Sequence, residues 1–287
     1  MVRRRSYPVW LIRALVLFAL AMTAFAAVVS RELHTTTLGR RVAIADYVAL
    51  EAGSLGATQR ALARQLAVAA YQISPTVTAS SKLLDLTGGL MPAKLADGPH
   101  PSTGPATTPP VPASQLTAAR LALARTRAIT PLERSLLSPD GMLLVAAGNN
   151  GLIYLWTLTN PSSPQLAAAL SGPSSTVTGL ALNADAGTLA VASEAGEIWL
   201  YAVGSPGQAT LQATITGAGR RLTDISFSAN NQALLTGRHH KRWYFRAYQA
   251  AQRVCALATS TLTTTQWALY VPQLAYRPPC PVPSAAR

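Results

Sequence analysis

The chain has 287 residues, 49% apolar and 12% charged, which is enough apolar material for a hydrophobic core and enough length for one or two domains. Its net charge of +13 favours acidic partners such as anionic lipid, cell-wall polymer or nucleic acid, although a diffuse basic surface also serves solubility alone. The sequence has two cysteines, which alone cannot make a zinc site, because such a site usually takes about four ligands.

Residues 1–30 have the pattern of a basic cytoplasmic tip followed by a transmembrane helix. Arginines at positions 3–5 precede the apolar run 9–30, whose only charge is Arg13. This run matches the ~20 residues that cross a hydrocarbon core, and basic residues favour the cytoplasmic side. We therefore expect a single-pass protein of the cell membrane, with a cytoplasmic N-terminus and an extracytoplasmic C-terminal part. A cleaved signal peptide is the alternative, because residues 24–26 (Ala-Phe-Ala) fit a cleavage pattern.

Residues 31–90 are expected to form a helical stalk. A stripe of apolar residues at helical spacing predicts one long helix over residues 37–74. Gly53 and Gly56 weaken the middle of this helix by about 1 kcal/mol each relative to alanine. The helix must end before Pro75, because a proline disfavours the α conformation in the residue that precedes it.

A second short helix is predicted over residues 78–86, with Gly88 as its C-terminal stop. Residues 91–130 form either a Pro-rich linker or an eroded repeat. The prolines gather between residues 97 and 112, where neither helix nor sheet is favoured. Residues 114–128 can form a helix, and a distorted strand is the alternative there.

Residues 131–250 contain a repeat with a period of 45 residues, marked by the equivalent leucines Leu144, Leu189 and Leu234. Each unit alternates apolar strands with polar turns rich in Pro, Asp, Gly and Asn, which suit tight hairpins. Four strands in about 40–45 residues are typical of a β-propeller blade. The fold class predicted is therefore mainly β, a partial or degenerate β-propeller preceded by a transmembrane helix and a helical stalk.

The repeat resembles WD-repeat proteins. Residues 138–141 (Ser-Pro-Asp-Gly) are similar to a hairpin common in bacterial WD repeats, and Leu155-Trp156 to the end of the third strand. Thr157 stands where the Asp of the WD pair is expected, and the usual Gly-His before each blade is missing. The resemblance therefore implies degenerate blades held by apolar packing, without the polar network that stiffens many WD blades.

The resemblance extends to actinobacterial STAND-type NTPases, in which a membrane helix precedes a C-terminal WD-repeat region. Residues 65–76 look like the helical stretch between the two, and residues 253–281 look like the tail of these proteins. The sequence has no Gly-x-x-x-x-Gly-Lys-Ser/Thr phosphate loop, so it resembles a relative without the NTPase domain.

Three recognisable blades are too few for a ring of about 4–8, so an open array would need a partner, a second copy or the helices to cover its edges.

The C-terminal tail, residues 251–287, holds both cysteines. Outside the membrane Cys255 and Cys280 can pair and close a loop of about 26 residues. The pair would attach the tail, including a helix expected over residues 264–270, to the last strand. Two free thiols are the alternative.

A candidate patch for an anionic partner surrounds the third repeat. Lipid head groups or wall polymers fit an extracytoplasmic patch better than nucleic acid does, and an ordinary solvated surface is the alternative. Its residues are Arg220, Arg221, Arg238, Lys241, Arg242, Trp243 and Arg246.

No nucleophile with a base, and no pair of carboxylates, stands in a recognisable catalytic pattern, and the four histidines form no catalytic motif. We therefore predict a non-enzymatic, membrane-anchored WD-repeat scaffold that binds a protein or an envelope component and uses no cofactor or metal. Association of copies into a homo-oligomer is also open. The alternatives are an envelope ligand sensor or enzyme that uses the propeller cavity, and an eroded remnant with little function.

Overall fold

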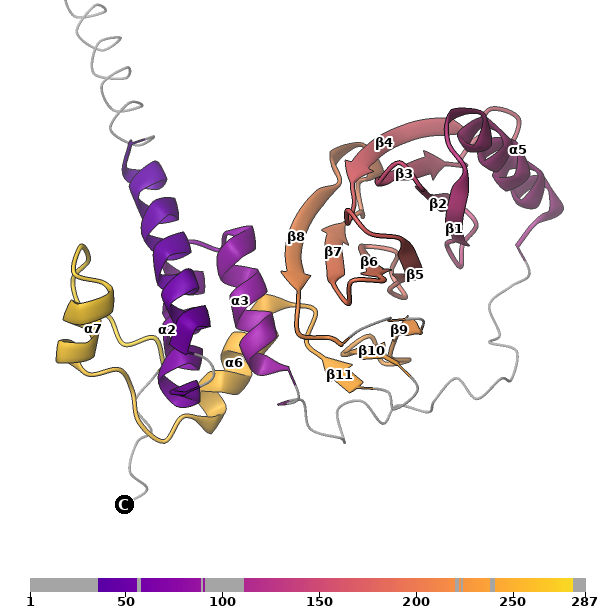
Figure 1. The fold of residues 1–287 in the computed structure, drawn as a ribbon. Helices are drawn as coiled ribbons and strands as arrows, with labels where there is room; N and C mark the ends of the chain where they lie inside the picture. Colours follow the sequence, from indigo (N-terminus) through magenta and orange to yellow (C-terminus); the bar gives the residue numbers. More distant parts are fainter. Residues whose placement is uncertain are drawn as a thin grey trace, which may run out of the picture.

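A computed structural model gives the fold (Figure 1). It describes residues 36–55, 58–88, 90, 111–219, 222, 224–237 and 241–280. The expected transmembrane helix at residues 9–30 and the proline-rich residues 91–110 lie outside this part of the chain. Among the described helices, none has the length and apolar character needed to cross a bilayer.

Three antiparallel sheets occupy the region between Leu132 and Trp243, and in each the strands follow one another in chain order. The first sheet holds β1 (Leu132–Leu137), β2 (Leu143–Gly148), β3 (Leu152–Thr157) and β4 (Gln165–Ser171). The second holds β5 (Val177–Leu182), β6 (Thr188–Ser193), β7 (Ile198–Ala202) and β8 (Thr210–Ile215), with a short 3-10 helix η1 (Pro206–Gln208) before β8. The third holds β9 (Ile225–Phe227), β10 (Leu234–Thr236) and β11 (Lys241–Trp243).

The first hairpin of each sheet is closed in the same way. Ser138, Asn183 and Ser228 stand at equivalent positions, and each is buried. The side-chain oxygen of each accepts a hydrogen bond from the backbone N–H five residues later, at 2.9, 2.7 and 2.9 Å. A short polar side chain before each turn thus replaces a backbone acceptor and fixes the hairpin, which explains why the period survives in the turns.

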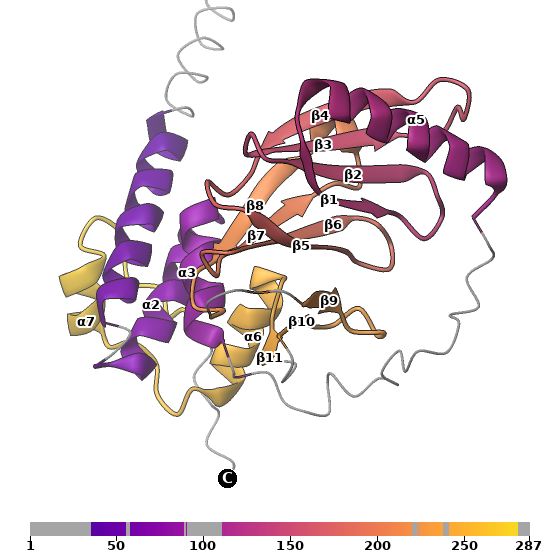
Figure 2. The ribbon, with the colours of Figure 1, turned by 45° about the vertical axis from the view of Figure 1, so that its right-hand side comes forward.

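The sheets lie side by side with their first strands in contact, and the described residues do not close a ring (Figures 1 and 2). Polar bonds repeat between neighbouring first strands. The Glu133 carboxylate accepts a hydrogen bond from the Val177 N–H at 2.7 Å, and Arg134 donates to the Thr178 carbonyl at 3.2 Å. The Thr178 hydroxyl in turn donates to the carbonyl of Leu222, which precedes the third sheet.

Helix α5 (Ala113–Ile129) covers the free face of the first sheet. Its alanines pack against apolar side chains of β2 and β3, and the buried Trp156 donates its indole N–H to the Thr126 hydroxyl at 3.0 Å. Of the two alternatives for residues 114–128 the structure has the helix, so no eroded repeat is built from α5. Small residues spaced along one face of α5 allow this close approach to the sheet.

The long helix expected over residues 37–74 is instead two helices. One covers residues 36–55, and α2 (Arg60–Ile73) begins after a turn in which the N–H groups of Thr58 and Gln59 bond to the Leu55 carbonyl. The interruption follows Gly53 and lets both helices contribute to one core. Helix α3 (Val77–Thr87) ends at Gly88.

The three N-terminal helices do not stand apart as a stalk. Helix α3 runs along β8, and the helices share a continuous core with the second and third sheets (Figure 2).

The third sheet lacks the fourth strand that its period predicts. In its place the chain forms α6 (Ala247–Leu257), which packs against α2 and α3, and further on α7 (Thr264–Tyr270). Ala250 and Val254 are buried while Gln252 between them is exposed, which fits the periodicity of a helix and not that of a strand. The disulfide between Cys255 and Cys280 therefore joins the tail to a helix, and not to the last strand as expected.

Candidate functional site

The outer edge of the second sheet is closed by α3. Ser81 and Asp85 stand one turn apart on the helix and face β8. The Ser81 hydroxyl accepts a hydrogen bond from the Thr214 N–H at 2.8 Å. The Asp85 carboxylate accepts bonds from the N–H of Thr216 at 2.7 Å and from its hydroxyl at 2.8 Å. The N–H groups that Thr214 and Thr216 would offer to another chain are thus already bound within this molecule.

The equivalent edge of the first sheet, strand β4, has a different environment. Ala169 pairs with Tyr154 in the same register in which Thr214 pairs with Trp199, so the Ala169 N–H also points away from its own sheet. In the described part of the chain, no side chain accepts a hydrogen bond from it. Ala169 is exposed and Leu166 is 44% exposed. We call β4 with its outward backbone groups the β4 edge.

The role of Asp85 can be tested by substitution. Asp85→Ala is expected to lower the free energy of unfolding by about 1 kcal/mol, because the N–H groups of Thr216 and Gly217, directly after β8, lose their acceptor. Asp85→Asn keeps one side-chain oxygen and should lose less. Urea denaturation of the two variants measures the difference, and an Asp85→Ala variant as stable as the wild type would show that the contact does not hold α3 on the sheet.

The candidate anionic patch is only partly described, because Arg220, Arg221 and Arg238 lie outside the described residues. The remainder does not form one surface. The Lys241 ammonium lies 4.3 Å from the centre of the Trp243 ring and donates to a backbone carbonyl at 3.2 Å.

Trp243 is only 2% exposed, and its indole N–H donates to the Thr236 hydroxyl at 3.0 Å. Trp243 is therefore a core residue, and the prediction that it belongs to a surface patch for an anionic partner is wrong. Arg242 is half-buried and Arg246 lies beyond the end of the strand.

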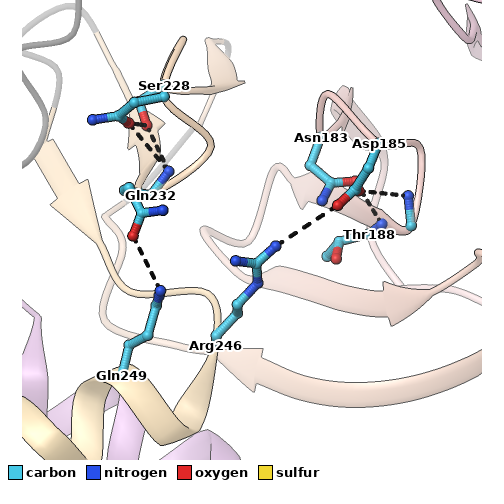
Figure 3. A network of polar contacts seen from close by, with 9 residues as sticks. Asn183, Asp185, Thr188, Ser228, Gln232, Arg246 and Gln249 are labelled. Atoms are coloured by element: carbon cyan, nitrogen blue, oxygen red, sulfur yellow. Dashed lines mark hydrogen bonds and ion pairs between the residues drawn. The ribbon is translucent and has the colours of Figure 1, made fainter.

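Arg246 instead lies at a cavity of about 270 Å³ between the helices, the second sheet and the start of α6, which we call the junction cavity. Its guanidinium is 3.9 Å from the Asp185 carboxylate in the turn between β5 and β6 (Figure 3). Nearby, Gln249 of α6 donates to the Gln232 side chain at 3.2 Å, and the Gln232 N–H donates to the Ser228 hydroxyl (Figure 3). These contacts fasten α6 to two hairpin turns, so Arg246 is already paired with an anion of the chain itself.

The shifted ionisable groups have structural roles. Burial raises the pKa of the Tyr201 hydroxyl, which donates to the carbonyl of Ser171 and so links the second sheet to the first. The Ser138 hydroxyl lowers the pKa of Asp140 by donating to its carboxylate in the first turn. Across the residues that the structure describes, no group of three or more His, Cys, Asp or Glu side chains could hold a metal ion.

The edge contacts of Ser81 and Asp85 were not predicted from the sequence. Their spacing of four residues on a short helix was a usable signal for one polar face. Nothing in the sequence indicated which strand that face would meet, because Asp85 and Thr216 are 131 positions apart.

No protein-family model matches the chain, and no curated protein matches it. Among solved structures, a similar chain comes from one described as "Crystal Structure of Mitotic Checkpoint Complex", with 19% sequence identity and a TM-score of 0.33. The match covers 38% of this chain and 32% of that chain, so it spans about a third of the neighbour's length. A likeness of that extent carries no conclusion on function.

The described residues define a class of protein by themselves: an open array of three repeated antiparallel sheets whose ends are covered by helices. The hairpin turn recurs in all three sheets, and the strand register recurs in the first two, as in proteins built by repetition of one unit.

Proposed function

We propose that this protein is a non-enzymatic, membrane-anchored scaffold whose three sheets are degenerate WD-type propeller blades, and that it binds a protein partner. In this proposal residues 9–30 cross the membrane with the N-terminus in the cytoplasm. The chain would then be a relative of the WD-repeat region of actinobacterial STAND-type NTPases, without the NTPase domain.

The difference between the two outer edges supports this proposal most strongly. Two side chains of α3 bind N–H groups along the β8 edge, whereas no described side chain accepts a hydrogen bond from the equivalent Ala169 N–H of the β4 edge, which lies near the exposed Leu166. An extended segment of a partner can add to such an edge as a further strand, with main-chain hydrogen bonds for affinity and side-chain contacts for specificity. The partner that fits is a protein with an extended, apolar segment, to which Leu166 would offer a contact.

The experiment compares two substitutions at Ala169 in tagged full-length protein recovered from native membranes. Ala169→Pro removes the outward N–H, and an edge strand tolerates proline where that group faces solvent. Ala169→Thr keeps the N–H and suits a strand. We expect the wild type and Ala169→Thr to recover one stoichiometric partner, and Ala169→Pro to bind the purified partner at least about tenfold more weakly.

Equal binding by the proline and threonine variants would place the partner elsewhere and reject the edge. Turnover of a small molecule without any protein partner would reject the scaffold and favour an envelope enzyme or sensor. Circular dichroism of Ala169→Pro must match the wild type for the comparison to stand.

A further inference from the structure

A second cavity is also lined by residues near the C-terminal end of α2, and we call it the tail cavity. It has a volume of about 260 Å³ and lies between residues 36–55, α2 and the C-terminal tail. Arg41 lines it from the first of these helices and Arg277 from the tail, so two segments far apart in the sequence each supply a guanidinium. Ile73 and Leu274 contribute apolar walls.

The tail is held in place at several independent points. The Gln72 amide donates to the Pro279 carbonyl at 2.7 Å, and the Trp267 indole donates to the Leu274 carbonyl at 2.9 Å. The Tyr276 hydroxyl bonds to a backbone carbonyl at 2.6 Å, and the disulfide fixes Cys280 to α6. Arg277 therefore projects from a segment that is ordered on both sides, which lowers the entropic cost of binding a ligand there.

The charges of the tail cavity are not balanced. None of its lining residues is acidic, and within the described part of the chain no carboxylate lies within salt-bridge distance of Arg41 or Arg277. Asp46, the nearest acid along the same helix, accepts a hydrogen bond from Thr76 instead. The junction cavity differs in this respect, because Asp185 already pairs with Arg246.

We propose that the tail cavity binds the phosphate group of a small phosphate ester, with Arg41 and Arg277 as its two ligands. Guanidinium groups present N–H donors in a planar fork that matches phosphate oxygens, and the two positive charges favour a dianion or a diester over a neutral ligand. The volume lies just below the usual range for small-molecule pockets, which limits the bound part to a head group or a compact metabolite.

Two sources offer this chemistry, a phospholipid head group and a free phosphate ester. The apolar run 9–30 ends six positions before the described helix begins, and six residues span at most about 20 Å. If that run crosses the membrane, a lipid head group is within reach of the tail cavity. The site does not use the β4 edge, so its failure would leave the proposed function untouched.

Isothermal titration calorimetry on the full-length protein in a neutral detergent tests the proposal, with glycerol 3-phosphate and short-chain phosphatidylglycerol as separate probes and phosphatidylcholine as the zwitterionic comparison. Saturable binding of both phosphate probes at one site supports a free ester site, and binding of phosphatidylglycerol alone supports a lipid site. Arg41→Gln and Arg277→Gln should each weaken binding about tenfold.

Arg40→Gln is the matched control, because it removes the same charge from the neighbouring residue, which does not line the cavity. It should leave binding within about twofold of the wild type. The proposal is overturned if neither probe binds saturably, or if Arg40→Gln weakens binding as much as Arg41→Gln does. Arg277→Lys keeps the charge, so intermediate binding by this variant separates loss of the ligand contact from loosening of the tail.

Discussion

Trp243→Ala is expected to lower the free energy of unfolding by about 3–5 kcal/mol, which is the usual cost of removing a large buried aromatic side chain. The ring is 2% exposed and belongs to the core shared by the helices and the second and third sheets. A Cβ atom placed on Gly88 would lie only 2.3 Å from it, so the end of α3 fits directly against the indole. Loss of the ring therefore separates the short third sheet from the helices.

Trp243→Phe is the matched variant for this prediction. It keeps most of the apolar volume but removes the indole N–H that bonds to the buried Thr236 hydroxyl at 3.0 Å, so we expect a loss of about 1–2 kcal/mol. Guanidinium denaturation of both variants measures the two losses. A Trp243→Ala variant with wild-type stability but weaker binding of anions would restore this residue to the partner surface and contradict the structure.

Replacing both cysteines with alanine is expected to cost about 3 kcal/mol, because the disulfide closes a loop with a sequence separation of 25 residues. The loop contains α7 and the buried side chains of Leu262, Trp267 and Val271, which complete the helical core. Without the link these groups pack only through their own contacts.

Thermal unfolding of the double variant, beside wild-type protein with and without a reductant, measures this effect. The reduced wild type should melt at the temperature of the double variant, well below the oxidised protein. Identical melting temperatures for all three would show that the tail is held without the disulfide. Because the tail also supplies Arg277, the reduced protein should bind phosphate esters more weakly.

The repeat was readable from the sequence because its signals are local. Turn residues such as Ser138 and Asn183 bond to their own hairpin, and the strands between them alternate over a few residues. The antiparallel sheets over residues 132–243 agree with that expectation, and the open ring agrees with the small number of repeats.

The predictions from the sequence were wrong where contacts between distant segments determine the local structure. The helix break near Thr58, the helical path of α6 and the cover of β8 by α3 each depend on contacts between segments that the sequence does not relate. The basic patch failed for another reason, because side chains on a strand alternate between faces. Lys241 and Trp243 share a face, and there the ring is buried beneath the ammonium.

The two capped ends explain how an open array can be stable. Helix α5 removes the apolar face of the first sheet from water, and α3 with α6 does the same beside the second and third. A closed ring is then unnecessary, because each terminal face has an apolar partner from the same chain. What remains open is the β4 edge, and the proposed scaffold uses that strand.

Amide hydrogen exchange on the full-length protein, resolved to single residues, tests this edge difference most directly. We predict that the amides of Thr214 and Thr216 exchange slowly because they donate hydrogen bonds to Ser81 and Asp85, while the Ala169 amide exchanges at close to the rate of an open chain and becomes slow when the partner is bound. Equal protection of Ala169 and Thr214 in the free protein would contradict it, because the first sheet would then have no open edge to offer.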